Sequence, residues 1–143
     1  MVILDAQMSN TNKNQFTHLK IHTQYSICEG AVKIIDLKDF CKKNKIHAIG
    51  LSDTKNLCGA LEFAENISKV GTQPIIGSQI NFKFKDQIGI LPIIANNFEG
   101  YKSIIRLSSK SYLENKTTDE PHCLLQELLK IKSGVTVLSG SFG

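Results

Sequence analysis

The chain has 143 residues, and its 17 Lys and Arg against 13 Asp and Glu give a formal net charge of +4. Its composition, 41% hydrophobic and 21% charged, is typical of one folded domain and excludes a disordered chain. The longest apolar runs, such as Ile88–Ala95, are far shorter than the roughly 20 residues of a membrane span, and the first residues lack the pattern of a secretory signal. We therefore expect a cytoplasmic protein without a membrane partner.

The first elements are predicted from the spacing of apolar residues. Residues 1–15 are polar and rich in Asn and Thr, which indicates a flexible leader. Phe16–His22 alternates like a strand, Thr23–Gly30 follows as a loop, and Ala31–Asn44 has the spacing of a helix. His47–Ser52 is a short apolar stretch that predicts the next strand.

The middle of the chain repeats this pattern and then departs from it. A polar turn at Asp53–Asn56 leads to a helix at Cys58–Val70. Pro74–Phe84 and Gln87–Ala95 are predicted strands, and the short link Lys85–Asp86 between them indicates a hairpin.

The last third is predicted to hold a helix at Phe98–Leu113, a loop at Glu114–Glu120, a helix at Pro121–Lys132 and a strand at Gly134–Ser139. The resulting order β-α-β-α-β-β-α-α-β predicts an α/β fold with a mostly parallel sheet. Because a complete (β/α) barrel needs about 200 residues or more, we expect this chain to be a truncated part of such a fold.

The basic residues are almost all Lys, since Arg106 is the only Arg. A protein that reads duplex DNA usually concentrates Arg for bidentate contacts to bases. The densest basic run, at 42–45, falls where a helix is expected to end, and Lys complements the helix dipole there. We favour this interpretation over a nucleic-acid patch.

The cysteines show no C-x-x-C spacing, which excludes a zinc ribbon. We expect them to be small buried side chains, as free cysteines usually are; they are Cys28, Cys41, Cys58 and Cys123.

Polar residues follow the predicted strands at 18–29, 52–56, 78–79 and 96–97, where the site of a βα fold is built. From residue types alone, His22, Glu29 and Asp53 form a candidate metal or acid–base cluster, because imidazole and carboxylate suit zinc or manganese. The alternative, which we favour, is that His22 and Asp53 hydrogen-bond the backbone of their loops.

Five segments, taken in order, resemble the PHP (polymerase and histidinol phosphatase) domain, and more narrowly the amino-terminal PHP domain of the bacterial DNA polymerase III alpha subunit. They are His18–Gly30, Ala48–Phe63, Gly71–Gln79, Leu91–Ser108 and Gly134–Gly140. The resemblance implies that residues 16–143 are the amino-terminal part of a PHP domain, roughly the first half of a (β/α) PHP-type barrel.

Active PHP enzymes bind two or three metal ions through His, Asp and Glu side chains for phosphoester hydrolysis. By resemblance, that cluster falls here on vestigial positions, which are Lys20, His22, Glu29, Asp53, Thr54, Gln79 and Ile90. Lys20, Thr54 and Ile90 stand where the family has His, and Gln79 stands where it has Glu. The resemblance therefore implies no catalytic residue and no metal in this region, with His22 and Glu29 as the remaining candidate ligands.

Lys20 places a positive charge where a metal dication would lie, and like charges repel. We expect Lys20 to act as a surrogate cation that pairs with Glu29 or Asp53.

The resemblance implies that this chain is a fragment of a DNA-directed DNA polymerase whose magnesium-binding carboxylates lie outside it. The PHP part would be a catalytically degenerate scaffold that docks the proofreading exonuclease subunit, with other replicase subunits and DNA as partners of the whole protein. The alternative is a metal-dependent PHP phosphoesterase acting on phosphate esters or DNA 3′ ends. A truncated piece would also expose sheet edges and self-associate.

Overall fold

The computed structural model describes residues 16–116, 118–139 and 141–142, so the predicted leader at 1–15 lies outside the described residues. The helices are α1 (Ile34–Asn44), α2 (Ala60–Ser68), α3 (Phe98–Leu113) and α4 (Leu125–Leu129). The strands are β1 (Ala48–Thr54), β2 (Gln73–Phe84), β3 (Gln87–Ala95), β4 (Cys123–Leu124), β5 (Val135–Val137) and β6 (Ser141–Phe142). Within those ranges, every helix is too short or too polar to cross a membrane.

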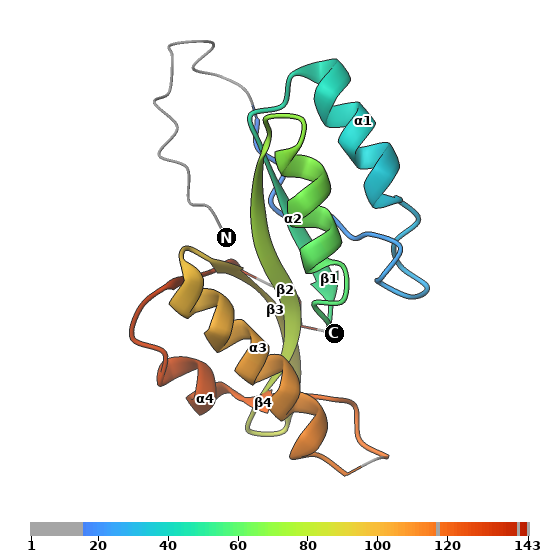
Figure 1. Ribbon diagram of the computed structural model, residues 1–143. Coiled ribbons are helices and arrows are strands. Elements are labelled where there is room, and N and C mark those ends of the chain that lie inside the picture. Colours follow the sequence, from blue (N-terminus) through green and yellow to red (C-terminus); the bar gives the residue numbers. More distant parts are fainter. Residues whose placement is uncertain (1–15, 117, 140, 143) are drawn as a thin grey trace.

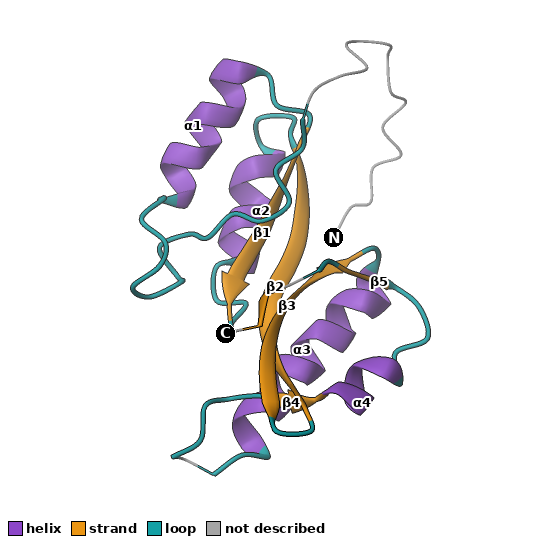
Figure 2. Ribbon diagram, turned by 180° about the vertical axis from the view of Figure 1, so that it is seen from behind, coloured by secondary structure: helices purple, strands orange, loops and turns teal. Residues whose placement is uncertain are grey.

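The strands form one sheet with the helices gathered on one of its faces (Figures 1 and 2). The strand order is β1-β2-β3-β5, with β4 paired to β2 and β6 paired to β3. The pairs β1–β2 and β2–β4 are parallel, whereas β3 is antiparallel to β2, β5 and β6. The α/β class is confirmed, but the prediction of a mostly parallel sheet is wrong.

The hairpin at Lys85–Asp86 explains this mixture. A two-residue link joins only antiparallel strands, because parallel strands need a long crossover. Lys85 takes a left-handed conformation with φ 55°, as tight hairpin turns require. The predicted hairpin is therefore correct. It reverses β3 relative to β2, so every strand that pairs with β3 does so antiparallel.

Two apolar clusters lie between the helices and the sheet. One joins α1 and α2 to β1, and its fully buried members include Ile34, Cys41, Leu51, Phe63 and Ile67. The other joins α3 and α4 to β2 and β3, around Ile80, Phe82, Ile93, Ile104 and Leu128. Cys41 and Cys123 are buried in these clusters as expected, whereas Cys28 and Cys58 are exposed, contrary to the prediction.

The predicted strand at Phe16–His22 is wrong as a regular strand. Ile21 forms a single bridge to Leu51, and the incoming segment has one residue more than β1 between its hydrogen bonds to that strand. The Gly50 N–H donates to the carbonyl of His18 at 2.7 Å, while the Gly50 carbonyl accepts from the N–H of Ile21 at 3.2 Å. Two residues, Leu19 and Lys20, thus lie opposite one, which is a bulge that breaks the alternation of side chains.

The carboxyl-terminal part also differs from the prediction. In place of one helix at Pro121–Lys132, the chain forms β4 and then the short helix α4. The reason is that β1 pairs only with the first part of β2, up to Gln79, so the edge of β2 beyond it is open. Cys123 fills that edge by pairing with Phe82. Strand β6 was not predicted.

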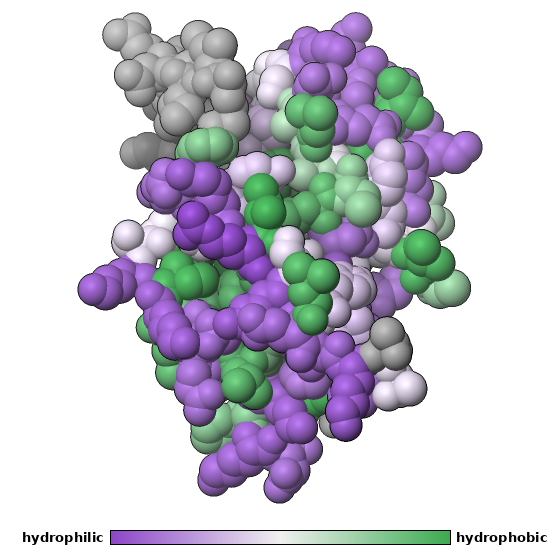
Figure 3. Space-filling view, turned by 60° about the horizontal axis from the view of Figure 1, so that its bottom comes forward, coloured by the Kyte–Doolittle hydropathy of each residue, from purple (hydrophilic) through white to green (hydrophobic). Residues whose placement is uncertain are grey.

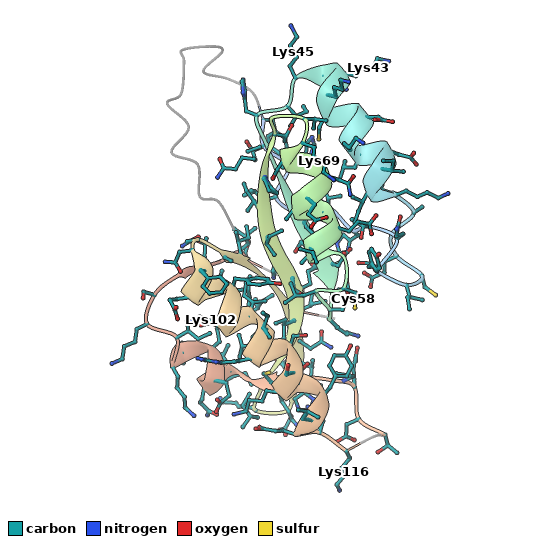
Figure 4. All side chains as sticks on the ribbon, in the orientation of Figure 1. Lys43, Lys45, Cys58, Lys69, Lys102 and Lys116 are labelled. Atoms are coloured by element: carbon teal, nitrogen blue, oxygen red, sulfur yellow. The ribbon has the colours of Figure 1, made fainter. Side chains whose placement is uncertain are left out.

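The basic run at 42–45 lies at the end of α1, with Lys42 and Lys43 in the last turn and Lys45 as a left-handed C-cap at φ 51° (Figure 4). This position agrees with the helix-dipole interpretation.

We predict that Gly50→Ala destabilises the protein by about 1–3 kcal/mol, the usual cost of overpacking. A Cβ on Gly50 would lie 2.8 Å from the Cα and carbonyl oxygen of Leu19, which are backbone atoms that cannot rotate away. Chemical denaturation measures the effect. Ser109→Ala on the exposed side of α3 is the control, expected within about 0.5 kcal/mol of wild type; a Gly50→Ala variant as stable as this control would contradict the close approach.

We predict that acid loosens α4 from α3. Glu127 accepts from Lys110 at 2.8 Å and from Lys130 at 2.7 Å, and these bonds lower its pKa from the usual 4.5 to about 2. A lowered pKa stabilises the folded state fully above pH 4.5 and loses that contribution as the pH falls through about 2. Denaturation should therefore show that the free energy of unfolding falls from pH 7 to pH 3, and that it falls less in Glu127→Gln. An equal fall in both proteins would contradict this role of Glu127.

Candidate functional site

Three of the four predicted groups of polar residues meet at one place. Thr54 and Gln79 are paired in register at the ends of β1 and the parallel stretch of β2, and the bridge between Ile21 and Leu51 sets His22 beside them. Successive side chains of a strand point to opposite faces, so Thr54 and Gln79 share a face while Asp53 points the other way.

On one face, His22, Glu29, Thr54 and Gln79 form a hydrogen-bonded cluster, which we call the histidine network. The Gln79 Nε2 atom lies 3.2 Å from the His22 Nε2 atom and 3.2 Å from the Thr54 Oγ1 atom. The Thr54 hydroxyl donates to the Glu29 carboxylate, and the His22 Nδ1 atom lies 3.5 Å from the Glu29 Oε2 atom.

The orientation of the Gln79 amide in the structure determines where the protons of this network lie. An amide nitrogen carries two hydrogens, so Gln79 donates one to the His22 Nε2 lone pair and one to the Thr54 hydroxyl oxygen. The imidazole then carries its hydrogen on Nδ1, facing Glu29. The Gln79 Oε1 atom is buried and has no hydrogen-bond partner among the described residues.

On the other face, Asp53 is fully buried and accepts three hydrogen bonds. Its donors are the Thr23 N–H at 2.6 Å, the Thr23 hydroxyl at 2.8 Å and the Ser26 hydroxyl at 2.7 Å. One of the three donors is a loop backbone N–H, as expected for Asp53, and the other two are side-chain hydroxyls. His22 contacts side chains and not the loop backbone that was expected. The three bonds to Asp53 leave its carboxylate oxygens engaged, and the described residues contain no group of three or more His, Cys, Asp or Glu placed to hold a metal ion.

The expected surrogate role of Lys20 is wrong. Lys20 is exposed and makes no ion pair with either Glu29 or Asp53. Glu29 pairs instead with His22, and Asp53 is taken up by Thr23 and Ser26. The bulge at Lys20 is the physical reason, because it takes this side chain out of step with His22.

The fourth polar group does not join the site. Because β3 runs antiparallel to β2, its carboxyl end lies away from the end of β1. There the Asn97 side chain accepts from the Gly100 N–H and caps α3, and Asn96 accepts from Thr136. Ile90 pairs with Asn81 and so lies diagonally across from Gln79, where it presents an alkyl group.

Two supporting contacts escaped the sequence analysis. The Tyr25 hydroxyl donates to Glu62 at 2.6 Å, which raises the tyrosine pKa and ties the loop to α2. Lys55, directly after β1, donates to Glu120 at 2.5 Å, and this bond lowers the pKa of the Glu120 carboxyl. These partners lie 37 and 65 residues apart in the chain, so no spacing pattern indicates them.

The comparisons with known proteins agree on one family. The family model described as PHP domain matches residues 18–143. The chain is 34% identical over 133 residues to the DNA polymerase III subunit alpha of Haemophilus influenzae, covering 91% of this chain and 11% of that protein. It is 33% identical over 146 residues to the Thermus aquaticus protein of the same name, and this match covers 92% of this chain and 12% of that protein. The chain thus spans about a tenth of the length of these relatives.

Among solved structures, an amidohydrolase from Chromobacterium violaceum matches with a TM-score of 0.53 and 14% sequence identity. The match covers 66% of this chain and 32% of that one, and at this identity it shows a likeness of fold alone.

We predict that Asp53→Asn lowers the free energy of unfolding by about 3 kcal/mol. Asn offers one acceptor oxygen and an NH₂ group to three donors, so at least one buried donor is left unpaired. Urea denaturation measures the loss. Asp39→Asn, on the exposed side of α1, is the matched control with an expected effect below about 0.5 kcal/mol. Equal stability of the two variants would show that Asp53 does not hold the loop.

Proposed function

Because this chain belongs to the PHP domain family, we propose that it is the PHP part of a replicative DNA polymerase III alpha subunit and serves there as a scaffold without catalysis of its own. The relatives named DNA polymerase III subunit alpha match over about nine tenths of the chain. The polymerase reaction itself, with its magnesium ions, would belong to other parts of the parent protein.

The histidine network carries the non-catalytic part of this proposal. A metal ion needs several lone pairs aimed at one point. Here the His22 Nε2 lone pair is used by Gln79, and the amide hydrogens of Gln79 fill the space between His22 and Thr54. The positions that the family resemblance assigns to ligands therefore bind one another, and the two replacements Thr54 and Gln79 are neutral donors. These residues do not fit a two-metal centre.

The architecture supports a scaffold role. We propose that the sheet is the first half of a PHP-type barrel, which the rest of the parent chain continues. The proofreading exonuclease and other replicase subunits would dock on the completed domain in the cytoplasm, and DNA would be bound by the whole protein. Taken alone, the chain would self-associate through sheet edges such as that of β5, whose Val137 is exposed.

One observation favours the second candidate, a metal-dependent phosphoesterase. His22 and Glu29, two of the three positions that keep ligand-type side chains, lie together with 3.5 Å between the Nδ1 and Oε2 atoms. Such an enzyme would need further ligands from outside this chain.

We predict that the intact polymerase subunit, purified without chelators, holds less than about 0.1 zinc, manganese or iron per PHP domain, because a site of this type needs at least three protein ligands. The variant Thr54→His/Gln79→Glu restores the family's ligand types at the two positions that lie beside His22 and Glu29, and should gain metal. Mass spectrometry measures both, with hydrolysis of a phosphate ester as a second readout.

The same Thr54→His/Gln79→Glu variant with His22→Ala added is the matched control and should lose the gained metal. Stoichiometric metal in the wild-type subunit that disappears with His22→Ala would overturn the scaffold proposal and establish the phosphoesterase.

A further inference from the structure

A groove of about 410 Å³ lies between α3 and the segment from α4 to residue 133, and no residue of the histidine network lines it. We call it the α3–α4 groove. Its charged lining comprises Arg106, Lys110, Glu127, Lys130 and Lys132, and Ser103 and Ser133 are its other polar residues. Leu107, which is 4% exposed and belongs to the second apolar cluster, forms part of its floor. Figure 3, which brings this end forward, shows hydrophilic side chains surrounding separate apolar patches.

The lining is strongly cationic, with four basic side chains against one carboxylate. The single acid, Glu127, lies between Lys110 and Lys130 and holds both ammonium groups in place, at 2.8 and 2.7 Å. The Lys110 ammonium also lies 3.4 Å from the Glu114 carboxylate. Each ammonium has three hydrogens, so Lys110 keeps one donor and Lys130 keeps two for a ligand. Arg106 and Lys132 make no ion pair with any described residue, which leaves their charges uncompensated.

The residue types indicate the chemistry of the ligand. Arg106 is the only Arg of the chain, and a guanidinium presents a planar fork of donors that matches phosphate oxygens. No aromatic side chain lines the groove, so bases have no surface on which to stack. The low dielectric of the apolar floor strengthens the attraction between the basic side chains around it and an anionic ligand.

We infer that the α3–α4 groove binds the phosphodiester backbone of a DNA strand, independently of its sequence. This inference rests on the proposed function, in which the parent protein works on DNA. Arg106 and Lys132 would each contact a phosphate, while Lys110 and Lys130, fixed by Glu127, would add a second pair of donors. An acidic protein segment is the competing occupant that the test must separate from DNA.

The test is fluorescence anisotropy of the full chain with a labelled single strand of about 20 nucleotides, over a series of salt concentrations starting at about 50 mM. We expect Arg106→Gln/Lys132→Gln to weaken binding about tenfold and to reduce the salt slope by about one for each contact removed. The matched control is Lys42→Gln/Lys43→Gln, which removes the same charge at the end of α1 and should change affinity less than about twofold.

Three results would overturn the inference: wild type that does not bind the strand at low salt, equal losses in the two double variants, or displacement of the strand by polyglutamate as effective as by unlabelled DNA of equal charge. The last would assign the groove to an acidic protein segment. The metal test concerns the histidine network, none of whose residues lines the groove. Failure of the DNA test therefore leaves the scaffold proposal standing, and failure of the metal test leaves DNA binding to be decided by the anisotropy measurement.

Discussion

The buried carboxylate of Asp53 is the constraint on which the site depends. A fully buried charge is costly unless it is hydrogen-bonded, and Asp53 meets this requirement by accepting from Thr23 and Ser26. Those bonds fix the loop that follows the bulged segment, which places His22 and Glu29 over the end of β1. Ser26 also accepts from the Thr54 N–H at 3.0 Å, so the same hydroxyl links the loop to the strand.

The histidine network is then a consequence of which side chains this scaffold presents. The backbone brings together a position on the incoming segment, one at the end of β1 and one in β2, as a metal centre would require. The side chains there, however, include an amide and a hydroxyl whose hydrogens need acceptors. The Thr54 hydroxyl, the Gln79 amide nitrogen and the His22 Nε2 atom are thus engaged with one another or with Glu29, whereas the Gln79 Oε1 atom is buried without a partner among the described residues.

Much of this could be predicted from the sequence, and the failures have specific causes. The bounds of β3 and α3 agree with the prediction, since a hairpin turn and an N-cap Asn are local signals. The meeting of His22, Thr54 and Gln79 followed from adjacent parallel strand ends. The bulge at Leu19 and Lys20 could not be predicted, because it depends on the approach of Gly50 from 30 residues away. The same bulge is the reason that Lys20 does not pair with Glu29 or Asp53 as expected. Asn96 and Asn97 lie away from the site because β3 runs antiparallel to β2.

The central claim is that the His22 Nε2 atom accepts a hydrogen bond from Gln79 and is therefore unavailable to a metal ion. Nitrogen NMR of the His22 ring, assigned with a His22→Gln variant, tests it directly. We predict a hydrogen on Nδ1, a lone pair on Nε2 that accepts a hydrogen bond, and no change in either nitrogen signal when stoichiometric zinc is added. A large shift of the Nε2 signal on addition of zinc would show that the imidazole leaves Gln79 to bind metal, and would contradict the account.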